Sequence, residues 1–321
     1  MRKFIPIIFF LVISLSFFLS TSCSSNKKEA NESENWCDQN LRPELSELEE
    51  IKTTNAWFKV YLVGKDVYAI AEPYNFQEVI SYLILGEEKA LLFDTGMGLS
   101  SIATVVKEIT NLPVTVINSH THYDHIGGNY EFNTILARNT SYTQNRAKNG
   151  MNHDVVKHEV SKEAFCAEKL PELDTLNYRI RSFVISDFIE DGNLIDLGNR
   201  KVKIVSVPGH TPDAIALLDE ENGYLWTGDT FYEAPIWLFD DETNLEDYKN
   251  SIDRLASLSS KLDKVFPAHN KPIAKPIRLV ELVDAFEQVL NGTKKNKSDD
   301  NSVASFEFEH FSFRIRNDLL K

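Results

Sequence analysis

Residues 119–128 read Ser-His-Thr-His-Tyr-Asp-His-Ile-Gly-Gly and place three of the chain's eight histidines within six positions. His120 and His122 stand two apart, so in an extended segment both imidazoles project to the same side. Asp124 shares that parity, whereas the adjacent His125 must point elsewhere. One small cation can take the two histidines, but it cannot easily take all four side chains.

Three further candidate ligands stand alone in turns that glycine or proline marks. They are His210 in Val-Pro-Gly-His-Thr-Pro-Asp, Asp229 in Thr-Gly-Asp-Thr and His269 in Phe-Pro-Ala-His-Asn. Together with the first motif they supply seven nitrogen and oxygen donors, whereas a tetrahedral zinc ion takes about four ligands and a catalytic one keeps a position for water. The set therefore indicates two metal ions about 3.5–4 Å apart, with one carboxylate between them.

The order His-x-His-x-Asp-His, Gly-His-Thr, Gly-Asp-Thr and a late histidine resembles the metallo-β-lactamase superfamily, over about residues 57–275. It is more similar to the glyoxalase II and dinuclear lactonase branch than to the lactamases, which lack a bridging carboxylate at the position of Asp229. The resemblance implies two zinc ions per chain, with iron or manganese as alternatives. It assigns His120, His122 and His210 to the first ion, Asp124, His125 and His269 to the second, and Asp229 to both.

Other residues receive roles from the same resemblance. Asp124 would also orient a metal-activated hydroxide and pass its proton to the leaving group. Asp94 follows a strand end and is either a carboxylate that accepts a ligand's other N–H or a plain turn residue. Tyr123, Tyr232 and Trp237 are possible substrate contacts, the last two within the apolar segment 231–239, which is either core or the wall of a cleft.

The implied activity is hydrolysis of a small ester, thioester, lactone or lactam. A mononuclear iron oxygenase of the persulfide dioxygenase kind is an alternative that needs fewer ligands. A non-catalytic surface binding protein on the same scaffold is another, although a dead site would be expected to have lost a ligand. The complete ligand set favours the hydrolase.

The elements that must position these ligands are strands that each end at a ligand. Apolar runs at 114–117, 202–207, 223–226 and 264–266 precede His120, His210, Asp229 and His269, and sites in α/β proteins usually lie beyond strand ends. Earlier runs at 57–63, 67–71, 79–85 and 90–93 predict two hairpins, and amphipathic helices are expected near 102–109, 245–258 and 279–290. The fold class is α/β, an αβ/βα sandwich of two mixed β-sheets flanked by helices.

The N-terminus predicts export. Residues 1–22 have a short basic start and an apolar run too short for a bilayer, which is typical of a signal peptide. Cys23 resembles the lipidated first residue of a bacterial lipoprotein, although Ser20 stands where leucine is usual. We expect a protein anchored to the cell envelope and facing the periplasm or the exterior, with residues 23–55 as a polar tether and 56–321 as the hydrolase domain.

Two regions of that domain carry their own expectations. Residues 131–190 form a long insertion that is partly helical and a possible cap over the site. Near the C-terminus, Phe306 and Phe308 alternate on one parity and Phe311 and Phe313 on the other, which predicts a terminal strand with a bulge.

Charge and cysteine content limit the partners. The net charge is −14, and loss of Arg2 and Lys3 with the signal would leave 32 basic against 48 acidic residues, or −16. Such a surface repels nucleic acid and leaves a small molecule as the expected substrate. An oxidising compartment favours a disulfide between Cys37 and Cys166, whereas the place of Cys37 in the tether argues against one.

Overall fold

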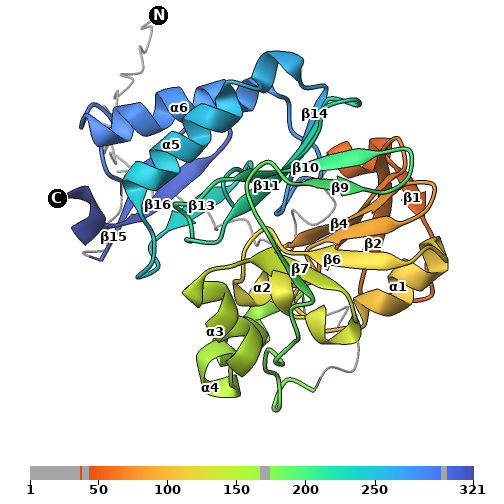
Figure 1. The fold of residues 1–321 in the computed structure, drawn as a ribbon. Coiled ribbons are helices and arrows are strands. Elements are labelled where there is room, and N and C mark those ends of the chain that lie inside the picture. The colour runs from red at the N-terminus through yellow and green to blue at the C-terminus, as the bar shows by residue number, and fades with distance from the viewer. Residues whose placement is uncertain (1–36, 38–42, 167–173, 298–301) are drawn as a thin grey trace, which may run out of the picture. The chain divides into compact units, whose positions relative to one another are not determined.

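The computed structural model describes residues 37, 43–166, 174–297 and 302–321. The expected signal peptide and Cys23 therefore lie outside the described residues. Within these ranges the chain forms three β-sheets, with eight, five and three strands (Figure 1).

The eight-stranded sheet follows the order of the chain. Its first five strands pair antiparallel and the remaining three add in parallel. Its strands are β1 (Glu49–Ile51), β2 (Lys59–Gly64), β3 (Val67–Ala71), β4 (Ile80–Leu85), β5 (Ala90–Phe93), β6 (Val114–Ile117), β7 (Ile135–Arg138) and β8 (Asp187–Ile189). The two expected hairpins are confirmed as β2–β3 and β4–β5.

The five-stranded sheet has the order β14-β12-β11-β10-β9, and the three-stranded sheet has the order β13-β16-β15. Their strands are β9 (Leu194–Asp196), β10 (Lys201–Ser206), β11 (Ile215–Asp219), β12 (Tyr224–Gly228), β13 (Pro235–Leu238), β14 (Lys264–Pro267), β15 (Val303–Glu307) and β16 (Ser312–Arg316). Both sheets mix parallel and antiparallel neighbours.

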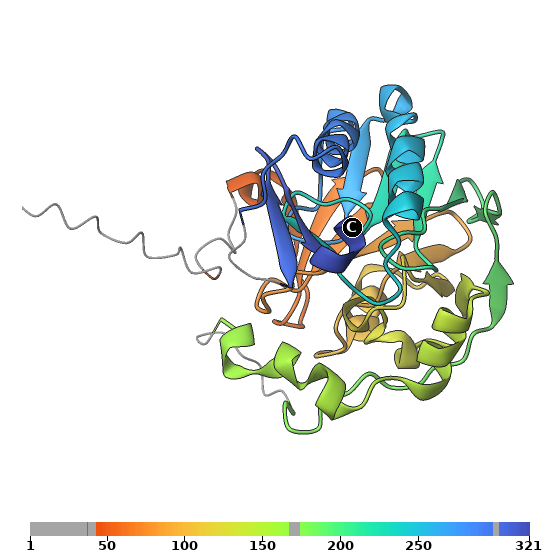
Figure 2. The ribbon, with the colours of Figure 1, turned by 90° about the vertical axis from the view of Figure 1, so that its left-hand side faces the viewer.

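Helices cover the outer faces of the two larger sheets. Those of the described ranges are α1 (Ile102–Ile109), α2 (Tyr123–Ile126), α3 (Ser141–Asn149), α4 (His153–Val156), α5 (Leu245–Ala256) and α6 (Ile277–Leu290). Helices α5 and α6 pack outside the five-stranded sheet and α1 outside the eight-stranded one, while Figure 2 shows α3 and α4 on the side opposite α5 and α6. The αβ/βα sandwich expected from the sequence is confirmed.

The core explains why the strands are apolar on successive residues. In β4, Tyr82 and Ile84 face the layer between the two large sheets, where they meet Trp226 and Phe266. Leu83 faces the other way and packs with α1 residues such as Val105. Strands that bury both faces lose the simple alternation of a half-exposed strand.

Three expectations need correction. Regular structure begins before residue 56, because Glu49–Ile51 pairs with β2; this short edge strand is mostly charged and has no apolar period to reveal it. The interval 131–190 is not wholly an insertion, since β7 and β8 belong to the main sheet. The C-terminal phase slip marks a turn rather than a bulge: β15 and β16 pair antiparallel, with Phe306 opposite Phe313.

A disulfide joins Cys37 to Cys166 across 129 residues, with Cα atoms 5.6 Å apart. Cys166 lies at the end of the helical part of the insertion, and its backbone N–H donates to the carbonyl of Tyr74 at 3.1 Å. The adjacent Phe165 forms a β-bridge with Asn75. The disulfide therefore ties Cys37 to the insertion, and the backbone contacts of Phe165 and Cys166 hold the insertion beside the loop that carries residues 74–78.

Candidate metal centre

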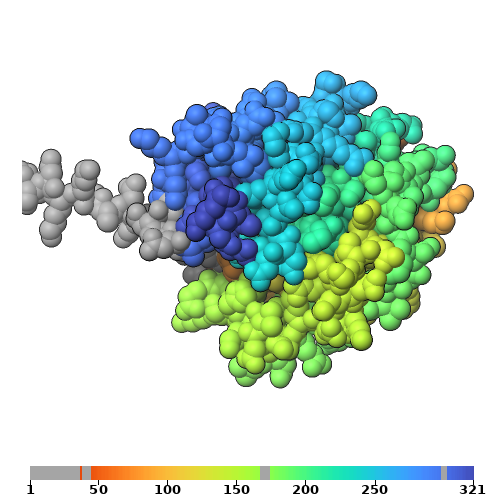
Figure 3. All heavy atoms as spheres, turned by 60° about the vertical axis from the view of Figure 1, so that its left-hand side comes forward, coloured from red at the N-terminus to blue at the C-terminus, as the bar shows by residue number. Residues whose placement is uncertain are grey.

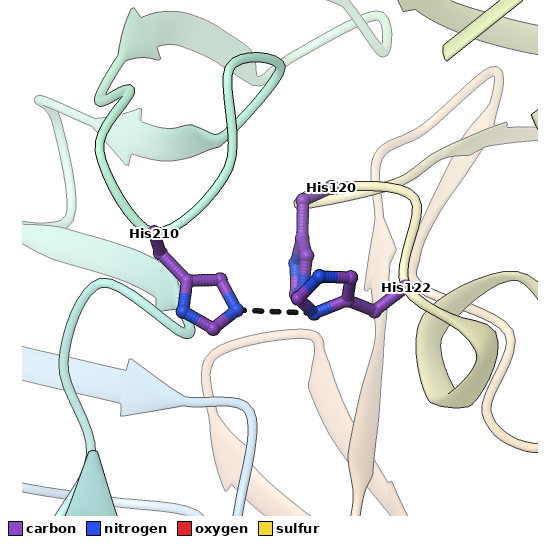
Figure 4. Close-up of side chains that lie close together, drawn as sticks. All are labelled: His120, His122 and His210. Carbon is purple, nitrogen blue, oxygen red and sulfur yellow. Dashed lines mark hydrogen bonds between the residues drawn. The ribbon is translucent and has the colours of Figure 1, made fainter. Parts of the chain in front are cut away.

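The seven expected ligands come together where loops from both large sheets meet. The loop after β6 and helix α2 carry His120, His122, Asp124 and His125, while His210, Asp229 and His269 follow β10, β12 and β14. Three overlapping groups have donor atoms within 4.8 Å of one another: His120 with His122 and His210, His120 with His125 and Asp229, and Asp124 with His125 and His269. Figure 4 shows His120, His122 and His210 converging from two loops. His210 Nε2 lies 3.1 Å from His122 Nδ1.

Asp229 lies between the groups. Its Oδ1 is 3.1 Å from Nε2 of His269 and 3.3 Å from Nε2 of His125. Its Oδ2 lies 3.6 Å from Nε2 of His210 and 3.9 Å from Nε2 of His120. Each carboxylate oxygen thus faces one pair of histidines, which is the arrangement that a bridging ligand requires.

The remaining aspartate of the first motif belongs to the second group. Asp124 Oδ2 is 3.5 Å from His125 Nε2 and 3.6 Å from His269 Nε2. All three side chains are buried. Buried charges and polar groups without partners are costly, so the enclosed site needs an occupant that satisfies them.

Several inward-facing atoms have no hydrogen-bond partner. Nε2 of His120, His125 and His269 and Oδ1 of Asp229 are buried and unsatisfied among the described residues. Such atoms are rare in folded proteins because each costs about 1–3 kcal/mol. Imidazole nitrogens and carboxylate oxygens are ligands for zinc and related divalent ions. The donor set fits two such ions.

The outward-facing nitrogens of two histidines are bound by carboxylates. His125 Nδ1 lies 2.9 Å from Oδ2 of Asp94, whose Oδ1 accepts the backbone N–H of Ser119 at 2.7 Å. His122 Nε2 lies 2.7 Å from Oδ2 of Asp240. A carboxylate in this position places the proton on the nitrogen that faces it and leaves the other nitrogen free to bind a metal.

Backbone carbonyls and a hydroxyl orient the other three rings. His210 Nδ1 is 2.8 Å from the carbonyl of Trp237, and His269 Nδ1 is 2.7 Å from the carbonyl of Gln77. His120 Nδ1 is 3.0 Å from Oγ of Ser119. Each of the five histidines of the site therefore has an outer partner.

Burial and neighbouring charge set the protonation of the ligands. Burial lowers the pKa of His210 to about 4 and lowers the pKa of His120 well below its usual range. Burial alone would raise the pKa of Asp229, but the adjacent His269 and His125 outweigh it and hold that pKa well below normal. Neutral imidazoles and an ionised carboxylate are the forms that bind metal, so His120, His210 and Asp229 are already in them. Against the effect of burial, the carboxylates of Asp124 and Asp229 raise the pKa of His125 and of His269, so a metal ion would have to displace a proton from these two rings.

A close approach of backbone brings the two halves together. Gly228, just before Asp229, has φ +53°, and a Cβ on it would lie 2.5 Å from Cβ of Ser119, just before His120. A side chain is excluded both by this contact and by the left-handed backbone. Glycine in Thr-Gly-Asp-Thr is thus part of the site's geometry.

The expected substrate contacts have different fates. Tyr232 is buried and its ring lies 4.9 Å from that of His269, so it packs beside this ligand. Tyr123 faces the insertion, where the ring of His158 lies 6.1 Å from its own, and its hydroxyl accepts from Gln77 Nε2 at 2.9 Å. Trp237 keeps 43% of its surface exposed. Segment 231–239 is both core and surface, because β13 alternates between buried and exposed residues.

Three residues that support the site were not expected from the sequence. Asp240 and Gln77 contact their histidines across 118 and 192 residues, and no local motif marks them. Asp213 accepts hydroxyl hydrogen bonds from Thr121, Thr143 and Thr211, at 2.7, 3.0 and 2.7 Å. Asp213 is the last residue of the motif Val-Pro-Gly-His-Thr-Pro-Asp, and this position could have indicated a role in the site.

Comparisons with a family model and with individual relatives agree on one protein family. The model of the metallo-beta-lactamase superfamily matches residues 76–269. Human acyl-coenzyme A thioesterase MBLAC2 is 24% identical over 231 residues, which cover 66% of this chain and 81% of the relative. The probable polyketide biosynthesis zinc-dependent hydrolase PksB of Bacillus subtilis (strain 168) is 24% identical over 198 residues, which cover 61% of this chain and 72% of the relative.

A solved structure with the same fold is the metallo-beta-lactamase family protein TTHA1429 of Thermus thermophilus. It superposes with a TM-score of 0.51 at 22% identity, covering 71% of this chain and 81% of the other. The superfamily protein ST1585 of Sulfolobus tokodaii also superposes with a TM-score of 0.51, at 19% identity, covering 74% of this chain and 90% of the other. At these identities the likeness supports the fold alone.

Proposed function

This chain belongs to the metallo-β-lactamase superfamily, and we propose that it is a hydrolase that uses two metal ions to cleave a small ester or thioester. The observation that carries the proposal is the position of Asp229 between two groups of buried ligands. A mononuclear iron enzyme would leave Asp124, His125 and His269 converging on a position without an ion. The thioesterase and hydrolase names of two relatives support the choice of bond.

Each ligand group has a defined task in this proposal. His120, His122 and His210 would hold one ion and Asp124, His125 and His269 the other, with Asp229 binding both. Zinc is the proposed metal, because the set consists of imidazole and carboxylate donors. When bound, the pair of ions supplies a hydroxide nucleophile at neutral pH and polarises the substrate carbonyl.

The chain's own residues then control protons and orientation. Asp94 and Asp240 hold the protons of His125 and His122 on their outer nitrogens, which keeps the inner nitrogens available. Asp124 would accept the proton released as the nucleophile attacks and deliver it to the leaving oxygen or sulfur. Burial of the ligands excludes bulk water from the charges that develop in the reaction.

The test is hydrolysis of a panel of thioesters, esters, lactones and β-lactams by zinc-loaded protein. We expect thioester or ester turnover that a chelator abolishes and zinc restores. His269→Ala should reduce the rate by orders of magnitude, whereas the matched control His310→Ala, which removes a histidine outside the site, should keep it. Absence of turnover across the panel would favour the binding-protein alternative, and one iron per chain would favour the oxygenase.

We further propose that the protein is exported and anchored through a lipidated Cys23. The support is the N-terminal sequence alone. In the described part of the chain, the structure has no helix with both the length and the apolarity to cross a bilayer. Wild-type protein should fractionate with membranes and Cys23→Ser with the soluble fraction; wild-type protein found wholly in the soluble fraction would contradict the anchor.

A further inference from the structure

We propose that Arg146, together with the exposed Trp237–Phe239 pair, binds the non-reacting part of the substrate, and that this part carries a carboxylate or phosphate beside an apolar group. The inference rests on the proposed hydrolase function and narrows its substrate to anionic acyl compounds.

Arg146 is held one side chain away from the metal centre. It lies on α3 one turn after Tyr142, and its guanidinium carbon is 4.9 Å from the centre of the Tyr142 ring. Tyr142 is buried, and its ring is 6.4 Å from that of the ligand His122. The tyrosine ring therefore binds the guanidinium through a cation–π contact and holds the guanidinium at a defined distance from the site.

The positive charge of Arg146 has no acidic partner at contact distance. Over the residues that the structure describes, no carboxylate forms an ion pair with it, and its hydrogen bond to Tyr142 Oη is long at 3.5 Å. Among the described arginines, Arg138, Arg179 and Arg181 also lack an ion pair, whereas five others have carboxylates within 4.0 Å: Arg200, Arg254, Arg278, Arg314 and Arg316. Arg146 differs from the other unpaired arginines in its contact with Tyr142, whose ring lies 6.4 Å from that of His122. In a chain with 48 acidic and 34 basic residues, an unpaired and half-buried arginine beside the site indicates an anionic partner from outside the chain.

Asp240, an acidic group at this end of the site, is already engaged. Asp240 accepts from His122 at 2.7 Å. Asp240 thus remains a partner of His122 and leaves the donors of the guanidinium available for a ligand.

An apolar surface adjoins the same end of the site. The rings of Trp237 and Phe239 are 5.2 Å apart and each is more than two-fifths exposed. The carbonyl of Trp237 binds His210, and Phe239 directly precedes Asp240. Figure 3 shows the cyan surface, the colour of β13, α5 and the residues between them, beside the yellow-green surface around α3, in agreement with the chain of contacts from Asp240 through His122 to Tyr142.

These features together recognise an amphiphilic anion. Exposed aromatic rings bind an acyl chain or another apolar group, and a guanidinium binds carboxylate or phosphate through paired N–H groups. A charged hydrogen bond of this kind changes affinity by about ten- to a hundredfold. The anion can belong to the acyl half of the substrate, as a second carboxylate, or to the leaving half, as the phosphates of a nucleotide-bearing thiol.

The test compares Arg146→Gln with Lys148→Gln, a control that removes an exposed cation from the same helix. Two substrate pairs separate the sources of the anion: mono-4-nitrophenyl glutarate against 4-nitrophenyl acetate, and hexanoyl-coenzyme A against hexanoyl-N-acetylcysteamine. We expect Arg146→Gln to raise KM about ten- to a hundredfold for the charged member of one pair, with little change in kcat or with the neutral members. Lys148→Gln should behave as wild type.

Binding provides a readout that does not depend on turnover. Calorimetric titration of the zinc-loaded proteins with glutarate and with free coenzyme A should show at least a tenfold weaker Kd for Arg146→Gln with one of the two. Equal affinities of wild type and variant for both compounds would overturn the inference, as would equal KM changes with charged and neutral substrates. Wild-type protein that binds one anion through Arg146 but hydrolyses none of the four substrates would instead refute the proposed function.

Discussion

Replacement of Asp94 by asparagine tests how the outer carboxylates control the metal ligands. Asp94 is buried, and its φ of +66° lies in the left-handed region, which asparagine adopts readily. The substitution therefore keeps the shape and the backbone. It replaces two acceptor oxygens by one acceptor and one NH₂ donor.

Neither orientation of the new amide can satisfy both neighbours. If its oxygen accepts from the N–H of Ser119, its NH₂ faces His125 Nδ1, and the imidazole must carry its proton on Nε2, the nitrogen that points into the site. If its oxygen accepts from His125, the buried N–H of Ser119 loses its partner, at a cost of about 1–3 kcal/mol. We expect the metal affinity of the group formed by Asp124, His125 and His269 to fall about 10- to 100-fold, or about 1.4–2.8 kcal/mol.

Chelator competition with metal quantified per chain measures this effect. Asp94→Asn should weaken the ion held by His125, whereas Asp240→Asn should weaken the ion held by His122, so each variant serves as the control for the other. If Asp94→Asn bound both ions as tightly as wild type, the assignment of a tautomer-fixing role to Asp94 would be refuted.

Three further predictions concern stability. Burial raises the pKa of Glu72 to about 7, so its protonated form favours the fold at low pH, and this contribution is lost as pH rises through about 7. Glu72→Gln should remove roughly 2–3 kcal/mol of the fall in unfolding free energy between about pH 5 and pH 8. Urea unfolding at several pH values measures this, and a fall as large as that of wild type would contradict the prediction. Gly228→Ala should lower the unfolding free energy by about 2–5 kcal/mol, because the left-handed backbone and the contact with Ser119 both disfavour a Cβ; urea unfolding at wild-type values would argue against that contact. Reduction of the Cys37–Cys166 disulfide should lower the unfolding free energy by about 2–4 kcal/mol. The unfolding free energy of a Cys166→Ser variant should not change with reductant. If that of wild-type protein did not change either, the disulfide would not constrain the unfolded chain.

Local sequence predicted the ligand-bearing loops because each ligand stands directly after the strand that positions it. His120 follows β6 and His269 follows β14, so apolar run and ligand are read together. The expected helix at 102–109 is α1, and its N-cap is Ser101, whose hydroxyl accepts from the N–H of Thr104. Such features depend on few residues that are close in sequence.

Features that depend on distant contacts could not be predicted. Asp240 reaches His122 only because the end of β13 lies against the loop after β6, and nothing in its own sequence surroundings indicates a role. In the sequence Arg146 is one of several polar residues in a polar helix. Its place near the site depends on the packing of Tyr142 against His122, which the sequence does not indicate. The phase slip near Phe308 was ambiguous, because a bulge and a turn displace the alternation alike, and only strand pairing distinguishes them.

The most direct test of the central claim is metal content and rate measured together for wild type, Asp229→Ala and His269→Ala. If Asp229 bridges two ions, wild type should bind two metals per chain, and both variants should keep at most one and lose activity by orders of magnitude. His310→Ala should match wild type in both measurements. A His269→Ala protein that retained full activity with a single bound metal would contradict the two-ion account.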